Sequence, residues 1–210
     1  MSRYRLQLGV FSMILIIQTP LLRLIYSRLG HDIFKLTTYL YFSLLIALAI
    51  YLAKKNRWNK KDLGIRLDNL KKGFSTYLLI TALGVLGILV LKNLMNHSVH
   101  PYLKTLWHFK GLFIISSVGQ EFLFRSYLIK LEKTVIPKKA LIIFLNGFLF
   151  GFIHIMVITE PVFLAFFLPF LLGILLAYAY LKYPNLFLAS ISHAVLNYLT
   201  ASFCFFSFYC

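Results

Sequence analysis

Residues 111–129 read GLFIISSVGQEFLFRSYLI, an apolar run in which Glu121 and Arg125 stand four positions apart. A charged side chain near the centre of a bilayer costs roughly 2.5 to 3.5 kcal/mol on insertion scales, so one that stays there lines a cavity, pairs with a partner or does chemistry. Side chains four residues apart lie on the same face of a helix. The run therefore predicts a membrane helix in which Glu121 can pair with Arg125.

Apolar runs of similar length fill most of the chain, which is 60% hydrophobic. A helix needs about 20 mostly apolar residues to cross a membrane, and seven blocks approach that length: 8–24, 36–52, 73–91, 111–129, 140–158, 162–181 and 185–208. No repeat, low-complexity tract or soluble domain separates them. We expect an all-α, polytopic membrane helix bundle of about seven transmembrane helices, with residues 1–210 as a single membrane domain. No small-x-small cleavage motif follows the first block, so it reads as a retained helix.

The formal net charge of +16 comes from Lys and Arg that cluster between the apolar blocks, most densely in 54–72 and 130–139. By the positive-inside rule, both clusters and the N-terminus face the cytoplasm and the C-terminus faces outward, although Arg23, Arg28 and Lys35 oppose this orientation. The cations are not interleaved with solvent-facing aromatic residues, as a nucleic-acid surface would require. Anionic membrane lipid is therefore the expected partner of these loops, and nucleic acid is not.

Smaller signals concern packing and the loops. Leu63, Leu67 and Leu70 follow a helical spacing, which fits a short amphipathic helix on the inner surface, while a solvated connector fits the same residues equally well. Small residues at the fifth block permit close helix approach, and proline is tolerated in membrane helices; these residues are Gly147, Gly151 and Pro169. The histidines His97, His100 and His108 are candidate metal ligands, but we interpret them as exposed loop histidines. We interpret Cys204 and Cys210 as lipid-facing or packing residues.

Two further polar motifs interrupt the later apolar blocks. His154 follows Phe150 by four residues, and Asn197 follows His193 by four, so each pair shares a helix face. At 1.5 Å per residue from the expected inner face, Glu121 and His193 lie at roughly 12 Å, Asn197 at roughly 18 Å and His154 at roughly 21 Å. These depths overlap within the error of the helix boundaries. The three motifs therefore predict one shared site.

This ordered set resembles the CAAX protease and bacteriocin-processing family (CPBP, or Abi) of intramembrane peptidases. The family pattern is Glu-Glu-x-x-x-Arg, then Phe-x-x-x-His, then His-x-x-x-Asn or Asp, on separate helices, and the part of this chain that matches is about 111–197. The resemblance implies hydrolysis of a peptide bond in a membrane-associated peptide or protein, with a glutamate and a histidine activating water and a second histidine and an asparagine binding the oxyanion. It implies catalytic positions at Gln120, Glu121, His154, His193 and Asn197, and supporting positions at Phe124, Arg125 and Phe150.

The same groups can work with or without a metal. A carboxylate can take a proton from water while imidazole and amide N–H groups stabilise the oxyanion. Alternatively, Glu121, His154 and His193 would be the ligands of a divalent ion such as zinc, for which Asn is an uncommon ligand. We favour the metal-free chemistry, without a cofactor.

Gln120 departs from the pattern because it occupies the position of the family's first Glu. An amide has nearly the shape of a carboxylate but cannot accept a proton at useful pH. Glu121 could act as the base itself, the chain could be a catalytically silent member, or Gln120 could be a deliberate substitution that preserves the fold. The expected function is an endopeptidase for CAAX-type or bacteriocin and signal-peptide precursors, in a bacterial cytoplasmic membrane. The alternative is a bacteriocin-immunity or regulatory protein that binds peptides; the repeated intramembrane charges of a transporter are not evident.

Overall fold

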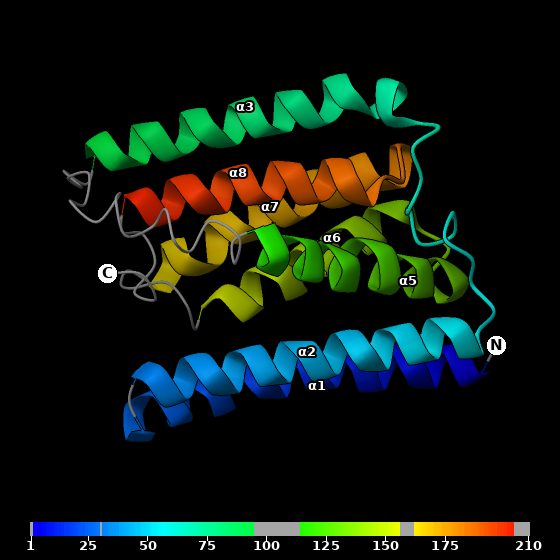
Figure 1. Ribbon diagram of the computed structural model, residues 1–210, viewed down its shortest axis with the longest axis horizontal. Coiled ribbons are helices and arrows are strands. Elements are labelled where there is room, and N and C mark those ends of the chain that lie inside the picture. Colours follow the sequence, from blue (N-terminus) through cyan, green and yellow to red (C-terminus); the bar gives the residue numbers. More distant parts are fainter. Residues whose placement is uncertain (1, 30, 95–113, 156–161, 204–210) are drawn as a thin grey trace.

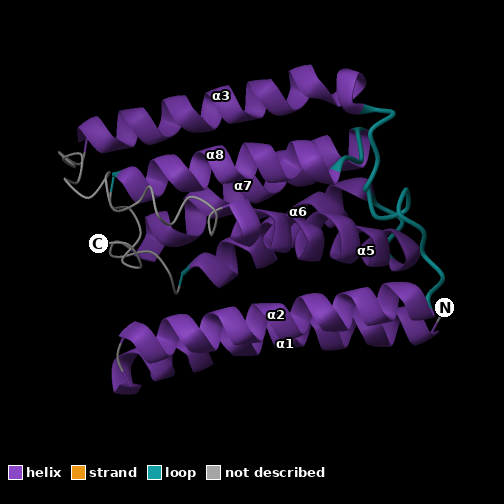
Figure 2. Cartoon of the chain, viewed as in Figure 1, coloured by secondary structure: helices purple, strands orange, loops and turns teal. Residues whose placement is uncertain are grey.

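The computed structural model describes residues 2–29, 31–94, 114–155 and 162–203, and these residues form helices and loops without a strand (Figure 2). Between α3 and α6, residues 114–135 form one continuous helix, which we call the Glu121 helix; it comprises 114–121, the π-helix η1 (Phe122–Leu128) and α5 (Ile129–Val135). The other helices are α1 (Ser2–Leu29), α2 (His31–Lys55), α3 (Leu70–Leu94), α6 (Lys139–His154), α7 (Val162–Lys182) and α8 (Leu186–Ser202). The predicted all-α bundle is confirmed.

Within the described residues, four helices are long and apolar enough to cross a membrane: Arg3–Leu29, Leu36–Lys55, Leu70–Leu94 and Phe163–Lys182. Two shorter apolar helices, α6 and α8, have 16 and 17 residues. The predicted blocks 140–158 and 185–208 extend beyond the ends of these two helices into residues outside the described ranges. The Glu121 helix is not among these apolar helices, because it carries charged side chains along its length, including Glu121, Arg125 and Lys130. The chain is an integral membrane protein whose helices alternate in direction (Figure 1).

The π-helix η1 lies at the centre of the bundle. All seven of its residues are buried, which no helix that faces lipid or solvent on one side can achieve. Helices α2, α6, α7 and α8 all contact it. In Figure 1, α1 and α2 form a pair on one side and α3 lies on the opposite side, with the Glu121 helix, α6, α7 and α8 between them. The segment that carries the sequence motif is therefore enclosed by protein.

Glycines allow α6 and α7 to pack closely, as the sequence predicts. A Cβ atom at Gly147 would lie 2.7 Å from Ile174 Cγ1, and one at Gly151 would lie 2.8 Å from the carbonyl oxygen of Phe166. Gly173 faces Gly147 from α7, where its Cβ would lie 2.9 Å from the Gly147 Cα atom. Close backbone approach through small residues is how membrane helices gain van der Waals contact. This contact fixes α6, which carries Phe150 and His154.

The amphipathic helix predicted at Leu63, Leu67 and Leu70 is wrong. Residues 56–69 form turns, and Gly64 has φ +67°, a left-handed conformation that interrupts any helix through Leu63 and Leu67. Leu67 is 68% exposed, whereas Leu63 is buried in the main core. A Cβ at Gly64 would also overlap the hydroxyl of Tyr180. The segment is an ordered loop packed on the bundle.

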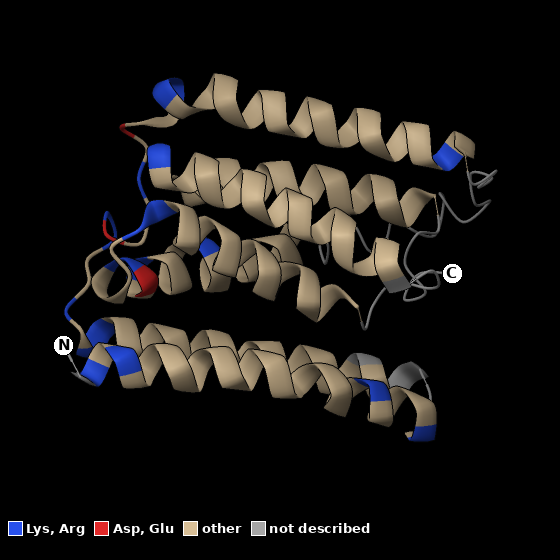
Figure 3. Cartoon of the chain, turned by 180° about the vertical axis from the view of Figure 1, so that it is seen from behind, with Lys and Arg blue, Asp and Glu red and all other residues tan. Residues whose placement is uncertain are grey.

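Cations gather at the end of the bundle that contains the N-terminus (Figure 3). This end carries Arg3, Arg5 and the residues of the two predicted basic loops, and fewer described cations, among them Arg23, Arg28 and Lys92, lie toward the other end. Each acid of the 56–69 loop is paired within the chain, Asp62 with Lys130 and Asp68 with Arg66. The uneven distribution is the one from which the sequence predicts a cytoplasmic N-terminus.

The close contact at Gly151 predicts that an added methyl group destabilises the protein there, but not at a glycine with open space around it. We expect Gly151→Ala to lower the stability by about 1 to 3 kcal/mol, the usual cost of overpacking, because the methyl group meets backbone of α7 rather than a flexible side chain. Gly87→Ala in α3 is the matched control, since nothing lies within 4 Å of its Cβ position. Thermal unfolding in detergent measures both. Equal melting temperatures for the two variants would contradict this account of the α6–α7 contact.

Candidate active site

A buried ion pair forms within the Glu121 helix. Arg125 Nε lies 3.2 Å from Glu121 Oε2, and both side chains are completely buried. The predicted pairing of these two residues is confirmed. Because the angle at Nε does not meet hydrogen-bond geometry, the contact is mainly electrostatic, and the guanidinium finds further partners in the carbonyl oxygen of Gly173, at 3.4 Å, and the ring of Phe150, with Cζ 4.3 Å from its centroid. A buried Arg is tolerated only when its charge is compensated in this way.

Glu121 also binds the imidazole of α8. His193 Nδ1 lies 2.9 Å from Glu121 Oε1, and the His193 side chain is only 1% exposed. Glu121 therefore has one oxygen against Arg125 and the other against His193. A carboxylate that binds one ring nitrogen fixes the orientation of the imidazole and leaves the other nitrogen, Nε2, for a different partner.

His154 joins the same cluster through Phe150. The His154 ring centroid lies 4.5 Å from that of Phe150, and the His193 ring centroid lies 5.4 Å from it on another side. Phe124 packs edge-on against Phe150 at 5.3 Å. Both imidazoles are buried, so neither is turned outward to lipid. The structure thus brings residues of all three motifs around one aromatic ring.

The proton position on His154 follows from its hydrogen bond. Its Nδ1 lies 2.7 Å from the carbonyl oxygen of Phe150, and a carbonyl can only accept, so Nδ1–H is the donor. In the neutral ring the lone pair is then on Nε2. His154 consequently presents a proton acceptor, with its orientation set by the preceding turn of its own helix.

Asn197 and Gln120 bind serines of the Glu121 helix. Asn197 Nδ2 donates to Ser117 Oγ at 3.2 Å, and Ser117 is fully buried one turn before Glu121. Gln120 Nε2 donates to Ser116 Oγ at 3.1 Å, while its Oε1 is buried without a hydrogen-bond partner. Asn197 therefore lies against the helix of Glu121, and Gln120 presents an acceptor oxygen and the second N–H of its amide, but no group that can take a proton.

The structure does not assemble the alternative metal ligands. In the ranges that it describes, no three His, Cys, Asp or Glu side chains are grouped closely enough to hold an ion, so Glu121, His154 and His193 do not form a coordination site. The contact of Glu121 with Arg125 also occupies an oxygen that a metal would need. The candidate ligands His97, His100 and His108 lie outside the described residues.

The sequence analysis missed several polar residues that support the site. Asn146 donates from Nδ2 to the carbonyl oxygen of Phe124 at 2.9 Å, which ties α6 to η1. Glu132 is a second buried carboxylate, 1% exposed, and Asn146 lies within its reach. Ser117 holds Asn197. Asn146 and Glu132 had a sequence signal that could have found them, since Asn146 interrupts an apolar block four residues before Phe150 and Glu132 follows Arg125 by seven residues, or about two helical turns. Ser117 looks like an ordinary helix serine.

Removing one partner of the buried ion pair should destabilise the protein more than replacing both partners by apolar residues. We expect Glu121→Gln to cost about 3 to 5 kcal/mol, because it leaves the Arg125 charge buried and uncompensated, and the double variant Glu121→Leu with Arg125→Met to recover much of that loss. Asp68→Asn, at an exposed ion pair, is the control and should leave the melting temperature unchanged. Thermal unfolding in detergent gives the comparison. A double variant that is less stable than the single one would show that the pair does not act as a charge-compensating unit.

Comparison with known proteins agrees with this geometry. No curated protein and no solved structure matches the chain. A model of the family described as type II CAAX prenyl endopeptidase Rce1-like matches residues 102–199, which include all three motifs. The match confirms the predicted resemblance: residues 102–199 of this chain are similar to the Rce1-like, type II CAAX prenyl endopeptidase family.

Proposed function

We propose that this chain is an intramembrane endopeptidase that cleaves a membrane-associated peptide or protein by metal-free activation of water, with its rate limited by Gln120. The observation that carries the proposal is the 2.9 Å contact between His193 Nδ1 and Glu121 Oε1. It joins two motifs that are 72 residues apart, in a buried setting where an unused carboxylate and imidazole would be costly. The family match to CAAX endopeptidases supports the same reaction.

In this proposal His154 is the general base. Its Nε2 lone pair takes a proton from water while the water oxygen attacks the peptide carbonyl carbon. When the tetrahedral intermediate collapses, the C–N bond breaks and His154 returns the proton to the leaving amine. The proton of the new carboxylic acid passes to the amine, so the products are a carboxylate and an ammonium group, and the protein regains its starting protonation state.

His193 and Asn197 bind the oxyanion. The Asn197 amide has two N–H donors, of which one is bonded to Ser117 and the second is the donor that we assign to the oxyanion. When His193 carries both protons, its Nε2–H is the second donor and Glu121 is its counter-charge. Such preorganised donors are worth most where water is excluded.

Glu121 acts in this proposal as an orienting group rather than as the base. Both of its oxygens are already in contact with partners, Arg125 and His193. This disfavours the explanation that Glu121 itself serves as the base in place of the glutamate that position 120 lacks. Gln120 can accept a hydrogen bond from water through Oε1 but cannot take its proton. His154 then works without a neighbouring carboxylate, and slow turnover follows.

The substrate class that fits a site enclosed by membrane helices is a lipid-adjacent peptide segment. Prenylated C-termini, bacteriocin precursors with double-glycine leaders and signalling peptides all belong to this class, and the family description favours the prenylated C-terminus. We propose a bacterial cytoplasmic membrane as the location, and the basic end of the bundle in Figure 3 supports a cytoplasmic N-terminus.

Gln120 supports one alternative, a silent family member that binds a bacteriocin-like or regulatory peptide without cutting it. In that case the polar cluster would hold peptide carbonyl groups through the same donors. The two functions differ in their products. Mass spectrometry of a membrane-bound peptide incubated with the purified protein separates them, because only the peptidase yields two fragments.

Restoring the carboxylate should restore the rate. We expect Gln120→Glu to raise the cleavage of a prenylated peptide in proteoliposomes by at least 10², the contribution typical of a positioned base. His154→Asn in the same background should abolish cleavage, because the Asn amide can still donate to the Phe150 carbonyl but has no basic nitrogen. Cleavage that persists without His154 would contradict its assignment as the base, and fully bound but intact peptide with Gln120→Glu would favour the silent alternative.

The proposed orientation is tested by cysteine accessibility. After replacement of Cys204 and Cys210 by Ser, Lys61→Cys should react with a membrane-impermeant maleimide only in inside-out vesicles, and Arg28→Cys only in intact cells, because the two exposed positions lie at opposite ends of the bundle. The reverse pattern would place the N-terminus outside.

A further inference from the structure

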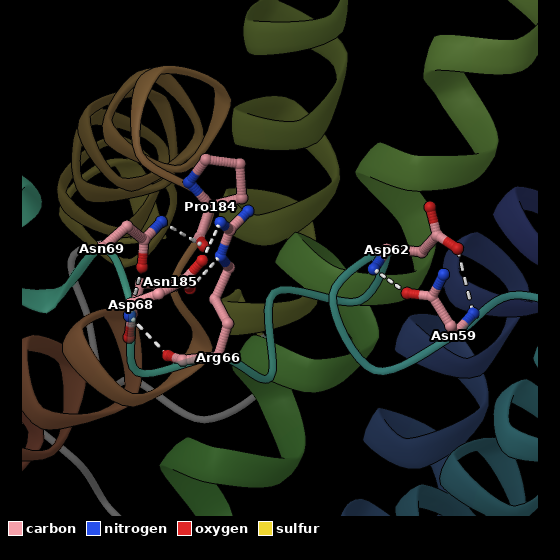
Figure 4. Close-up of polar contacts among 7 residues, drawn as sticks. All are labelled: Asn59, Asp62, Arg66, Asp68, Asn69, Pro184 and Asn185. Atoms are coloured by element: carbon pink, nitrogen blue, oxygen red, sulfur yellow. Dashed lines mark hydrogen bonds and ion pairs between the residues drawn. The ribbon is translucent and has the colours of Figure 1, made fainter.

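The loop between α2 and α3 has an internal hydrogen-bond network that gives it a defined shape. We call residues 59–69 the connector (Figure 4). Asn59 N donates to Asp62 Oδ2 and Asp62 N donates to Asn59 Oδ1, both at 2.9 Å. Arg66 donates to both carboxylate oxygens of Asp68, and these bonds lower the pKa of the Asp68 carboxyl to about 2. The reciprocal Asn59–Asp62 bonds therefore give the connector a defined first turn, whereas the Arg66–Asp68 pair, with Asp68 exposed, adds little to its shape.

The connector is bonded to the turn that begins α8. Asn69 Nδ2 donates to the Pro184 carbonyl at 2.9 Å, and Asn185 Nδ2 donates to Asn69 Oδ1 at 2.7 Å (Figure 4). Asn185 Nδ2 also donates to the Arg66 carbonyl, and Leu186 N donates to the Gly64 carbonyl, both at 2.9 Å. Asn185 is fully buried. Four bonds thus hold the start of α8 to the connector.

The connector is also bonded to the Glu121 helix. Lys130 Nζ lies 2.7 Å from Asp62 Oδ1, and this hydrogen bond lowers the pKa of the Asp62 carboxyl, so the pair stays ionised at neutral pH. Leu63 adds an apolar contact, because it belongs to the buried core that includes Tyr127, Leu128 and Leu131. The ion pair is partly exposed, so it contributes little to stability alone. The pair matters because it links the connector to the Glu121 helix, whereas the other bonds link it to α8.

The catalytic contact lies at the same depth on both of these helices. Glu121 is nine residues from Lys130 and His193 is eight residues from Asn185, which is about 12 to 14 Å along each helix. Helix α8 packs chiefly on α3 and has only a small direct contact with η1. Besides the direct bonds of Glu121 with His193 and of Ser117 with Asn197, the connector therefore adds a link to each of the two helices, at Lys130 and at the start of α8.

We propose that the connector is a clamp that sets the separation of the Glu121 helix and α8, and that Asn185 is the positioning residue on which the His193–Glu121 contact depends. The role of that contact in hydrolysis rests on the proposed function, whereas the clamp itself does not. A displacement of 1 Å at reacting groups can cost 10² in rate, so a loop outside the site can control turnover.

Asn185 has a second role that the test must separate. Its Oδ1 accepts from Leu188 N at 3.0 Å, which caps the N-terminus of α8. Asn185→Ser keeps a capping oxygen and removes the two donated bonds, so it breaks the clamp and preserves the cap. Asn69→Ser removes the bond to Pro184 without touching the cap and serves as a second variant. Asp68→Asn is the control, because the exposed Asp68 side chain pairs with Arg66 and reaches neither motif helix.

The clamp is tested by the distance between spin labels at Lys133→Cys and Phe187→Cys, two exposed positions on the Glu121 helix and α8, with Cys204 and Cys210 replaced by Ser. In nanodiscs we expect one narrow distance distribution for the parent and for Asp68→Asn, and a broader or shifted one for Asn185→Ser and Asn69→Ser. Unchanged distributions in both serine variants would overturn the clamp.

Kinetics in the Gln120→Glu background then test the proposed effect of the clamp on turnover. We expect kcat for Asn185→Ser to fall at least 10-fold with KM unchanged, because the chemistry and not the binding depends on the contact. Changed distances with unchanged kcat would overturn the positioning role of Asn185. Changed distances in a protein that cleaves nothing, even with Gln120→Glu, would support the clamp and refute the proposed function.

Discussion

The buried contact of Glu121 with Arg125 and His193 is the interaction on which the rest of the structure depends. Neither charge is exposed at all, so each must be compensated by protein groups delivered from other helices. Phe150 and Gly173 bring α6 and α7 to the guanidinium, and His193 brings α8 to the carboxylate. The enclosure of η1 by four helices follows from this requirement, because an exposed side would leave the pair in contact with lipid.

In the proposed mechanism, the same contact gives the polar residues of the site different roles. Glu121 contacts Arg125 and His193, and among the described residues His154 is bonded through Nδ1 to a carbonyl. In the proposed mechanism Glu121 therefore does not replace the carboxylate that position 120 lacks, and Nε2 of His154 is the base. Around this centre, Ser117 and Asn146 hold Asn197 and η1, and the connector holds the two helices at their common end.

The sequence predicted much of this arrangement because the cost of charge in a membrane is large and local. Apolar blocks interrupted by Glu121, Arg125, His154 and His193 indicate both the helices and their shared centre, and the contacts of Glu121 with Arg125 and His193 bear this out. The π-helix and the ordered connector could not be found in this way. Leu63 and Leu67 have helical spacing, but the left-handed conformation of Gly64 and the carbonyl acceptors of Arg66 and Pro184 are backbone properties that periodicity does not reveal.

The position of the Glu121 helix in the chain has a consequence for biogenesis. It is not among the four helices that are apolar enough to enter a bilayer by themselves, and three of those four, α1, α2 and α3, precede it. As translation proceeds, the charged segment therefore emerges when earlier helices already occupy the membrane, and α1 and α2 offer it contacts through α5 and η1. Its full compensation comes only with α6 to α8, so integration of this segment depends on residues that are synthesised after it.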